Sequence, residues 1–191
     1  MTKSTSRKTL SAAALASLLA TPALAHTGHE VSGFVAGIEH PLHGLDHLLA
    51  MAAVGMWAAL QPLSRAWHGP VLFVAMLAAG AGLGISGVDL PFVEPGILAS
   101  VVLFGMMVAT ARRVPAPLGL VLIGGFALLH GHAHGTEAVG AAGSYMAGFM
   151  LSSLALHLTG FATARLLSRI DWAVSAAGLA VALAGAALMA S

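Results

Sequence analysis

The chain has 191 residues, of which 58% are hydrophobic and only 8% are charged, and its mean hydropathy is +0.91. These values exclude an ordinary soluble protein and indicate an integral membrane protein, because soluble domains carry about 25% charged residues. Cysteine is absent, which excludes disulfides, thiolate metal ligands and a cysteine nucleophile. Histidine is unusually abundant: ten histidines outnumber the eight basic and the seven acidic residues taken separately.

Residues 1–25 are typical of a cleaved secretory signal peptide. Three basic residues, Lys3, Arg7 and Lys8, precede an apolar run that ends in small residues at Ala25. An uncleaved first helix is the alternative, although the run is short for a membrane span. Removal of the segment leaves five basic against seven acidic residues, so the formal net charge changes from +1 to −2. The remaining residues contain no basic segment that would favour a nucleic-acid partner.

Residues 26–191 are predicted to form one domain, an all-α bundle of six transmembrane helices. Hydrophobic windows separated by Pro, Gly and charged residues lie at 33–60, 69–87, 93–111, 117–134, 139–164 and 171–190. The basic residues of the connections follow only the first, third and fifth windows: Arg65, Arg112, Arg113, Arg165 and Arg169. Because cytoplasmic loops carry the excess of Lys and Arg, these connections are predicted to be cytoplasmic. A multi-pass protein of the bacterial inner membrane with both mature termini in the periplasm is therefore expected.

The first window is too long for one straight span. Residues 31–60 would form a helix of about 45 Å, against a hydrocarbon core of about 30 Å. Pro41 disfavours a helical conformation at His40 and lacks an amide donor, so a break is predicted there, with Pro41 opening the main helix. Glycine-rich sequences in the first, second and fifth windows predict close approach of helix backbones.

A first cluster of ionisable residues, "HPLHGLDH", occupies positions 40–47. On a helix that begins at Pro41, His43 and His47 share one face, and Asp46 flanks His43. His40 lies one turn above them if the helix reaches that far. Neutral imidazole and carboxylate are ligands for divalent nickel, cobalt, zinc and copper, so this group predicts a metal site.

A second cluster, "LHGHAHGTE", occupies positions 129–137, at the same predicted outer side as the first. His130 and His134 are four residues apart, and Glu137 extends their face if the helix persists through Gly135. His132 points elsewhere on an ideal helix and ranks below them. Ionisable groups near bilayer depth are costly and tend to face a cavity, pair or bind ions, so two clusters at one face predict a divalent-metal site. A buried hydrogen-bond and proton network is the alternative.

Three further histidines extend the predicted path. If cleavage follows Ala25, the mature chain begins at His26 and continues to His29, which offers either an external capture site or merely a mobile polar terminus. His157 lies about 24 Å along the fifth window from Ala141, past mid-membrane. It is either an inner relay for the ion or a structural hydrogen-bonding residue.

Two motifs, in this order, resemble those of the HupE/UreJ family of small membrane proteins. The form H-P-x-x-G-x-D-H matches at His40, Pro41, Gly44, Asp46 and His47. The form F-H-G-x-A-H-G-x-E matches His130 to Glu137, with Leu129 in place of the usual phenylalanine, a change that affects packing rather than ligation. The resemblance covers essentially the whole mature chain. It implies a permease, not an enzyme, that takes up nickel or cobalt and indirectly supplies hydrogenase or urease maturation.

The expected substrate is thus Ni²⁺ or Co²⁺, with no prosthetic group, and the expected partners are the metal ion and the lipid bilayer. The candidate metal ligands are His26, His29, His40, His43, Asp46, His47, His130, His132, His134, Glu137 and His157. The sequence lacks a G-x-x-x-x-G-K-[ST] loop, so it carries no standard ATPase site. Two alternatives stay open: a non-transporting metal receptor or assembly partner, and a histidine-box membrane oxygenase, which the lack of adjacent histidines disfavours. The oligomeric state, homo-oligomers included, is also open.

Overall fold

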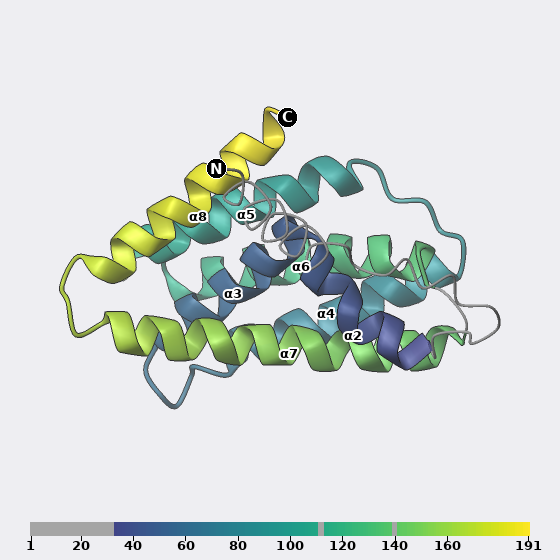
Figure 1. Ribbon diagram of the computed structural model, residues 1–191, viewed down its shortest axis with the longest axis horizontal. Coiled ribbons are helices and arrows are strands. Elements are labelled where there is room, and N and C mark those ends of the chain that lie inside the picture. Colours follow the sequence, from purple (N-terminus) through teal and green to yellow (C-terminus); the bar gives the residue numbers. More distant parts are fainter. Residues whose placement is uncertain (1–32, 111–112, 139–140) are drawn as a thin grey trace, which may run out of the picture. The chain divides into compact units, whose positions relative to one another are not determined.

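The computed structural model describes residues 33–110, 113–138 and 141–191, and residues 31–191 form one compact unit. Within the described residues every regular element is a helix (Figure 1). The helices are α2 (Gly33–His43), α3 (Leu45–Ala59), α4 (His68–Ile85), α5 (Val93–Ala109), α6 (Ala116–Thr136), α7 (Ala142–Leu167) and α8 (Ala173–Met189). The all-α prediction is therefore confirmed. The signal peptide predicted at residues 1–25 lies outside the described residues and stays a prediction.

Three of these helices, α4, α6 and α7, are long and apolar enough to cross a membrane. The apolar helices α3, α5 and α8 are shorter, with 15, 17 and 17 residues. A helix of 17 residues is about 26 Å long, slightly less than the roughly 30 Å of a hydrocarbon core. The fold thus agrees with a membrane protein, whereas the count of six spans stays a prediction.

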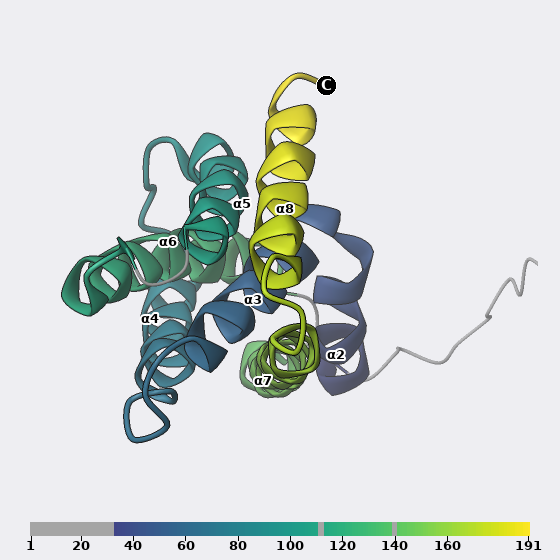
Figure 2. The same cartoon turned by 90° about the vertical axis from the view of Figure 1, so that its left-hand side faces the viewer.

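The first predicted window is divided at Gly44, which corrects the break expected before Pro41. Pro41 lies inside α2, and Gly44 has extended backbone angles, with φ −92° and ψ 110°. Glycine is a poor helix former, and Oδ1 of Asp46 accepts the backbone N–H of His47 at 2.8 Å, an amide that the first turn of a helix leaves unpaired. A new helix therefore starts at Leu45, and Figures 1 and 2 show α2 and α3 running in different directions. The helical face predicted to be shared across this segment is not formed.

The helices pack most closely in pairs: α4 with α6, α5 with α8, and both α2 and α3 with α7. Figure 2 shows α2 beside α7 and α5 beside α8. Small residues allow this proximity, since a Cβ added at Gly37 of α2 would collide with the backbone of Tyr145, and one at Gly80 of α4 with the backbone of Leu128. The predicted close approach of helix backbones at these glycines is confirmed.

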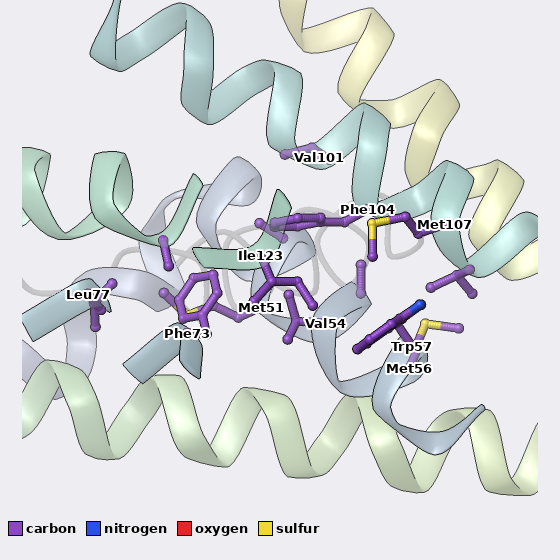
Figure 3. Close-up of a cluster of buried hydrophobic side chains, with 14 of the residues drawn as sticks. Met51, Val54, Met56, Trp57, Phe73, Leu77, Val101, Phe104, Met107 and Ile123 are labelled. Carbon is purple, nitrogen blue, oxygen red and sulfur yellow. The ribbon is translucent and has the colours of Figure 1, made fainter. Parts of the chain in front are cut away.

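The hydrophobic core joins side chains from α3, α4, α5 and α6 in a single cluster. Met51, Phe73, Phe104 and Ile123, one from each of these helices, are at most 1% exposed and are drawn with their neighbours in Figure 3. Burial of this apolar surface fixes the relative positions of the four helices. The core thereby holds α3, which carries Asp46 and His47, and α6, which carries the histidines of the second cluster, in a fixed arrangement.

Candidate metal centre

The two histidine clusters of the sequence meet inside the bundle. His47 lies in the first turn of α3, and His130 and His134 lie one turn apart near the end of α6. One nitrogen atom from each of these three rings lies within 4.8 Å of the others. The ring centroids of His47 are 4.7 Å from His130 and 4.4 Å from His134. We call these three residues the buried triad, because His130 and His134 are 0% exposed and His47 is largely buried.

A second group shares His134 and opens toward the surface. Nε2 of His40 lies 3.1 Å from Oε2 of Glu137, and Nδ1 of His134 lies 3.7 Å from the same oxygen. The side chains of His40 and Glu137 are 38% and 52% exposed, whereas that of His134 is 1% exposed. We call His40, His134 and Glu137 the rim triad. The two triads form a continuous run of donor groups from the surface into the bundle.

Asp46 contacts the buried triad through its neighbour His47. Its Oδ1 accepts a hydrogen bond from Nδ1–H of His47 at 2.7 Å. A carboxylate can only accept, so this bond places the ring proton on Nδ1 and leaves the lone pair on Nε2. Carboxylate partners of this kind orient histidine ligands in metal sites and increase their basicity.

Several nitrogens of the buried triad lack a hydrogen-bond partner among the described residues. They are Nε2 of His47, Nδ1 of His130, and both nitrogens of His134. Buried polar atoms in proteins are almost always paired, so four such atoms in one place indicate a site for a bound ligand. A divalent cation matches this arrangement, because neutral imidazole nitrogens and a nearby carboxylate are its common ligands. The site also lies at the carboxyl end of α6, where the helix dipole favours positive charge.

Two predicted ligands lie outside both triads. His43 ends α2, is exposed, and donates from Nδ1 to the carbonyl oxygen of Glu39 at 2.9 Å. The break at Gly44 separates it from the triads, which corrects the prediction that His43 shares a helical face with His47. His132 is buried on another side of α6 and donates from Nε2 to the carbonyl oxygen of Val88 at 2.6 Å, which ties α6 to the chain after α4.

His157 lies on α7 and is 1% exposed. Neither of its ring nitrogens has a hydrogen-bond partner within the described part of the chain. Its ring packs edge-on against Phe73 at 4.9 Å between centroids, and Phe73 also contacts the ring of His130 at 5.8 Å. Phe73 therefore lies against both the buried triad and His157. The two histidines predicted near the mature N-terminus, His26 and His29, lie outside the described residues.

Sequence reasoning missed several residues that contact the triads, among them Phe149, whose ring centroid lies 3.9 Å from that of His134, Phe73 and Ser100. Phe73 looks like any core aromatic in an apolar helix, and no local pattern sets it apart. Ser100 lies in α5, far in sequence from both clusters, yet its Oγ is 2.9 Å from Nε2 of His130. The only sequence signal for Ser100 was that it carries the single hydroxyl group of the apolar helix α5. Polar side chains in such helices often form hydrogen bonds to a neighbouring helix.

The fold and this site together define an all-helical protein of apolar helices with a histidine-rich candidate metal centre. The family model described as HupE / UreJ protein matches residues 13–188. Protein HupE of Rhizobium leguminosarum bv. viciae is 43% identical over 185 residues, which cover 95% of this chain and 95% of that protein. The chain belongs to the HupE/UreJ family, as its two motifs predicted. No solved structure matches it.

Proposed function

We propose that this protein is a permease of the bacterial inner membrane that takes up a divalent metal cation, Ni²⁺ in the first place and Co²⁺ as the nearest competitor. The observation that carries the proposal is the buried triad, in which one nitrogen from each of three imidazoles lies within 4.8 Å of the others, and each ring has at least one nitrogen without a hydrogen-bond partner among the described residues. Membership of the HupE/UreJ family, which is linked with nickel supply to hydrogenases and ureases, supports nickel as the cargo.

The donor set suits a cation that must be bound and then released. Imidazole nitrogens bind nickel, cobalt, zinc and copper, and Glu137 and Asp46 offset part of the cost of holding a dication away from water. A transported ion must be bound strongly enough to be captured and weakly enough to be released. Several adjacent binding sites meet both requirements better than a single closed site. His134 belongs to both triads, so a cation can exchange ligands there without leaving the donor groups.

The proposed route begins at the exposed rim triad and continues to the buried triad. The fall in exposure from Glu137 to His134 supports this direction of entry. Beyond the buried triad, Phe73 contacts both His130 and His157, and the nitrogens of His157, which lack hydrogen-bond partners in the described ranges, would receive the ion as an inner relay. His26 and His29 are proposed as an external capture site. The chain is proposed to cross the membrane six times, with both mature termini in the periplasm. We propose transport rather than catalysis, with the metal ion as cargo.

Nickel uptake into proteoliposomes tests this proposal. The wild type should accumulate ⁶³Ni²⁺, and His47→Ala and His134→Ala should abolish uptake because each removes a ligand of the buried triad. His68→Ala is the matched control, since His68 is exposed at the start of α4 and belongs to neither triad. Cobalt, zinc and copper as competitors would rank the substrates. Wild-type vesicles that bind nickel without accumulating it would contradict transport and favour a receptor or assembly partner.

A further inference from the structure

Ser100 is a buried residue of α5 that reaches His130 of the buried triad. Its Oγ lies 2.9 Å from Nε2 of His130 and 2.6 Å from the backbone carbonyl oxygen of Ile97. Ser100 and His130 are both 0% exposed, so solvent water does not compete for these bonds. Among the described residues, α5 supplies no member of either triad, and this contact joins it to the candidate metal centre.

A single hydroxyl proton has to serve both contacts of Ser100. The carbonyl oxygen of Ile97 can only accept a hydrogen bond, so the hydroxyl of Ser100 donates to it. The lone pairs of Oγ then face His130, and Nε2 of that ring must carry the proton that is donated to them. Nδ1 of His130 consequently keeps its lone pair.

The opposite tautomer of His130 is unfavourable for two reasons. A proton on Nδ1 would be a buried donor without an acceptor in the described ranges. The hydroxyl of Ser100 would also have to turn toward the ring, and its Oγ would then face the carbonyl oxygen of Ile97 at 2.6 Å as one acceptor against another. Both effects favour the tautomer with the proton on Nε2.

We propose that Ser100 is a positioning residue that holds His130 as the Nε2–H tautomer and so presents the Nδ1 lone pair to the cation. This inference rests on the proposed function. Asp46 fixes His47 in the reverse sense, with the proton on Nδ1 and the lone pair on Nε2. Two residues outside the triad thus prepare two ligand lone pairs before the ion arrives. Loss of such a partner lowers metal affinity by about 10–100-fold in known sites.

Nickel titration by calorimetry on the full-length purified protein tests the effect on affinity. Ser100→Ala removes the acceptor, and its nickel affinity should fall by about 10–100-fold. Ser100→Thr keeps the hydroxyl and should restore most of that loss. Ser152→Ala is the matched control, since Ser152 is a serine of α7 with 6% exposure, and it should leave the affinity unchanged. Equal losses in Ser100→Ala, Ser100→Thr and Ser152→Ala would indicate a packing effect and overturn the assignment.

The tautomer itself can be read without metal by ¹⁵N NMR on histidine-labelled protein, with the His130 signals assigned by their absence in His130→Gln. The wild type should show a protonated Nε2 and an unprotonated Nδ1, and Ser100→Ala should show a mixture of tautomers. An unprotonated Nε2 in the wild type, or an unchanged tautomer in Ser100→Ala, would overturn the role of Ser100. If the wild type bound no nickel, the proposed function would fail, while this spectrum would still decide the role of Ser100.

Discussion

His43 and His47 look equivalent in sequence, four residues apart in one motif, but they differ in what they contact. His43 is exposed and bonded to the backbone of its own helix, whereas His47 belongs to the buried triad. We therefore expect His47→Ala to lower nickel affinity by at least about 10-fold and His43→Ala to leave it nearly unchanged. Calorimetric titration of both purified variants measures this. Equal losses in the two would mean that the break at Gly44 is not kept in the metal-bound protein.

Local spacing was enough to find most of the residues that gather at the candidate centre. His130 and His134 lie on one face of α6 because they are four residues apart on a continuous helix, and Glu137, the residue that caps its end, follows His134 by three. Ser100 could not be found in this way, since its partner lies 30 residues away and only helix packing brings them together. Spacing along one helix predicts contacts within that helix, whereas contacts between helices depend on how the helices pack.

Among the helices, the close packing of α4 against α6 depends on glycines that other residues cannot replace. A Cβ at Gly131 would collide with the backbone of Leu77, whereas one at Gly125, on the same helix, would meet nothing within 4 Å. Gly131→Ala should therefore force α4 and α6 apart and destabilise the protein by about 1–3 kcal/mol. Gly125→Ala should cause no loss, because alanine is the better helix former. Thermal unfolding in detergent measures both, and equal midpoints would contradict this packing.

The course of the first predicted window shows where reasoning about single elements fails. Proline alone suggested a break before Pro41, yet a proline near the end of a helix removes one hydrogen bond and leaves the last turn intact. The break instead falls at Gly44, where an extended glycine precedes an aspartate that accepts the backbone N–H of His47. The boundary thus coincides with a weak helix former, followed in the first turn of the new helix by a carboxylate that accepts an otherwise unpaired amide. Gly44 and Asp46 are both visible in the sequence. The sequence alone does not tell whether they or Pro41 determine where the helix breaks.

The topology of the whole chain can be tested simply because the sequence contains no cysteine. Each introduced cysteine is then the only target for a membrane-impermeant maleimide. Ser64 lies in the exposed connection after α3, next to Arg65, and Asp89 lies in the exposed connection after α4. We expect Asp89→Cys to be labelled from the periplasm and Ser64→Cys only after permeabilisation, because basic connections stay in the cytoplasm. The reverse pattern would invert the proposed direction of uptake.

Across the whole molecule, nickel binding and nickel transport should be separable by mutation, because the proposed path has two binding positions, the triads and the inner relay His157. Phe73 contacts both His130 of the buried triad and His157, whose nitrogens have no hydrogen-bond partner among the described residues. His157→Leu removes the inner relay but leaves the side chains of both triads in place. It should therefore keep nickel affinity within about threefold of the wild type, because losses of 10-fold or more come from residues that bond to a metal ligand, and His157 hydrogen-bonds to none among the described residues.

Uptake into proteoliposomes should nevertheless fall by about 10-fold or more in His157→Leu, because an ion leaving the buried triad would lose its next imidazole, and the cost of holding a dication away from water without a ligand is high. His157→Gln keeps a polar group at the same position and should retain part of the transport. Thermal unfolding of both variants controls for packing, since His157 contacts Phe73 in the core. Normal uptake by a stable His157→Leu protein would remove His157 from the path and leave the triads as the whole of the metal-handling site.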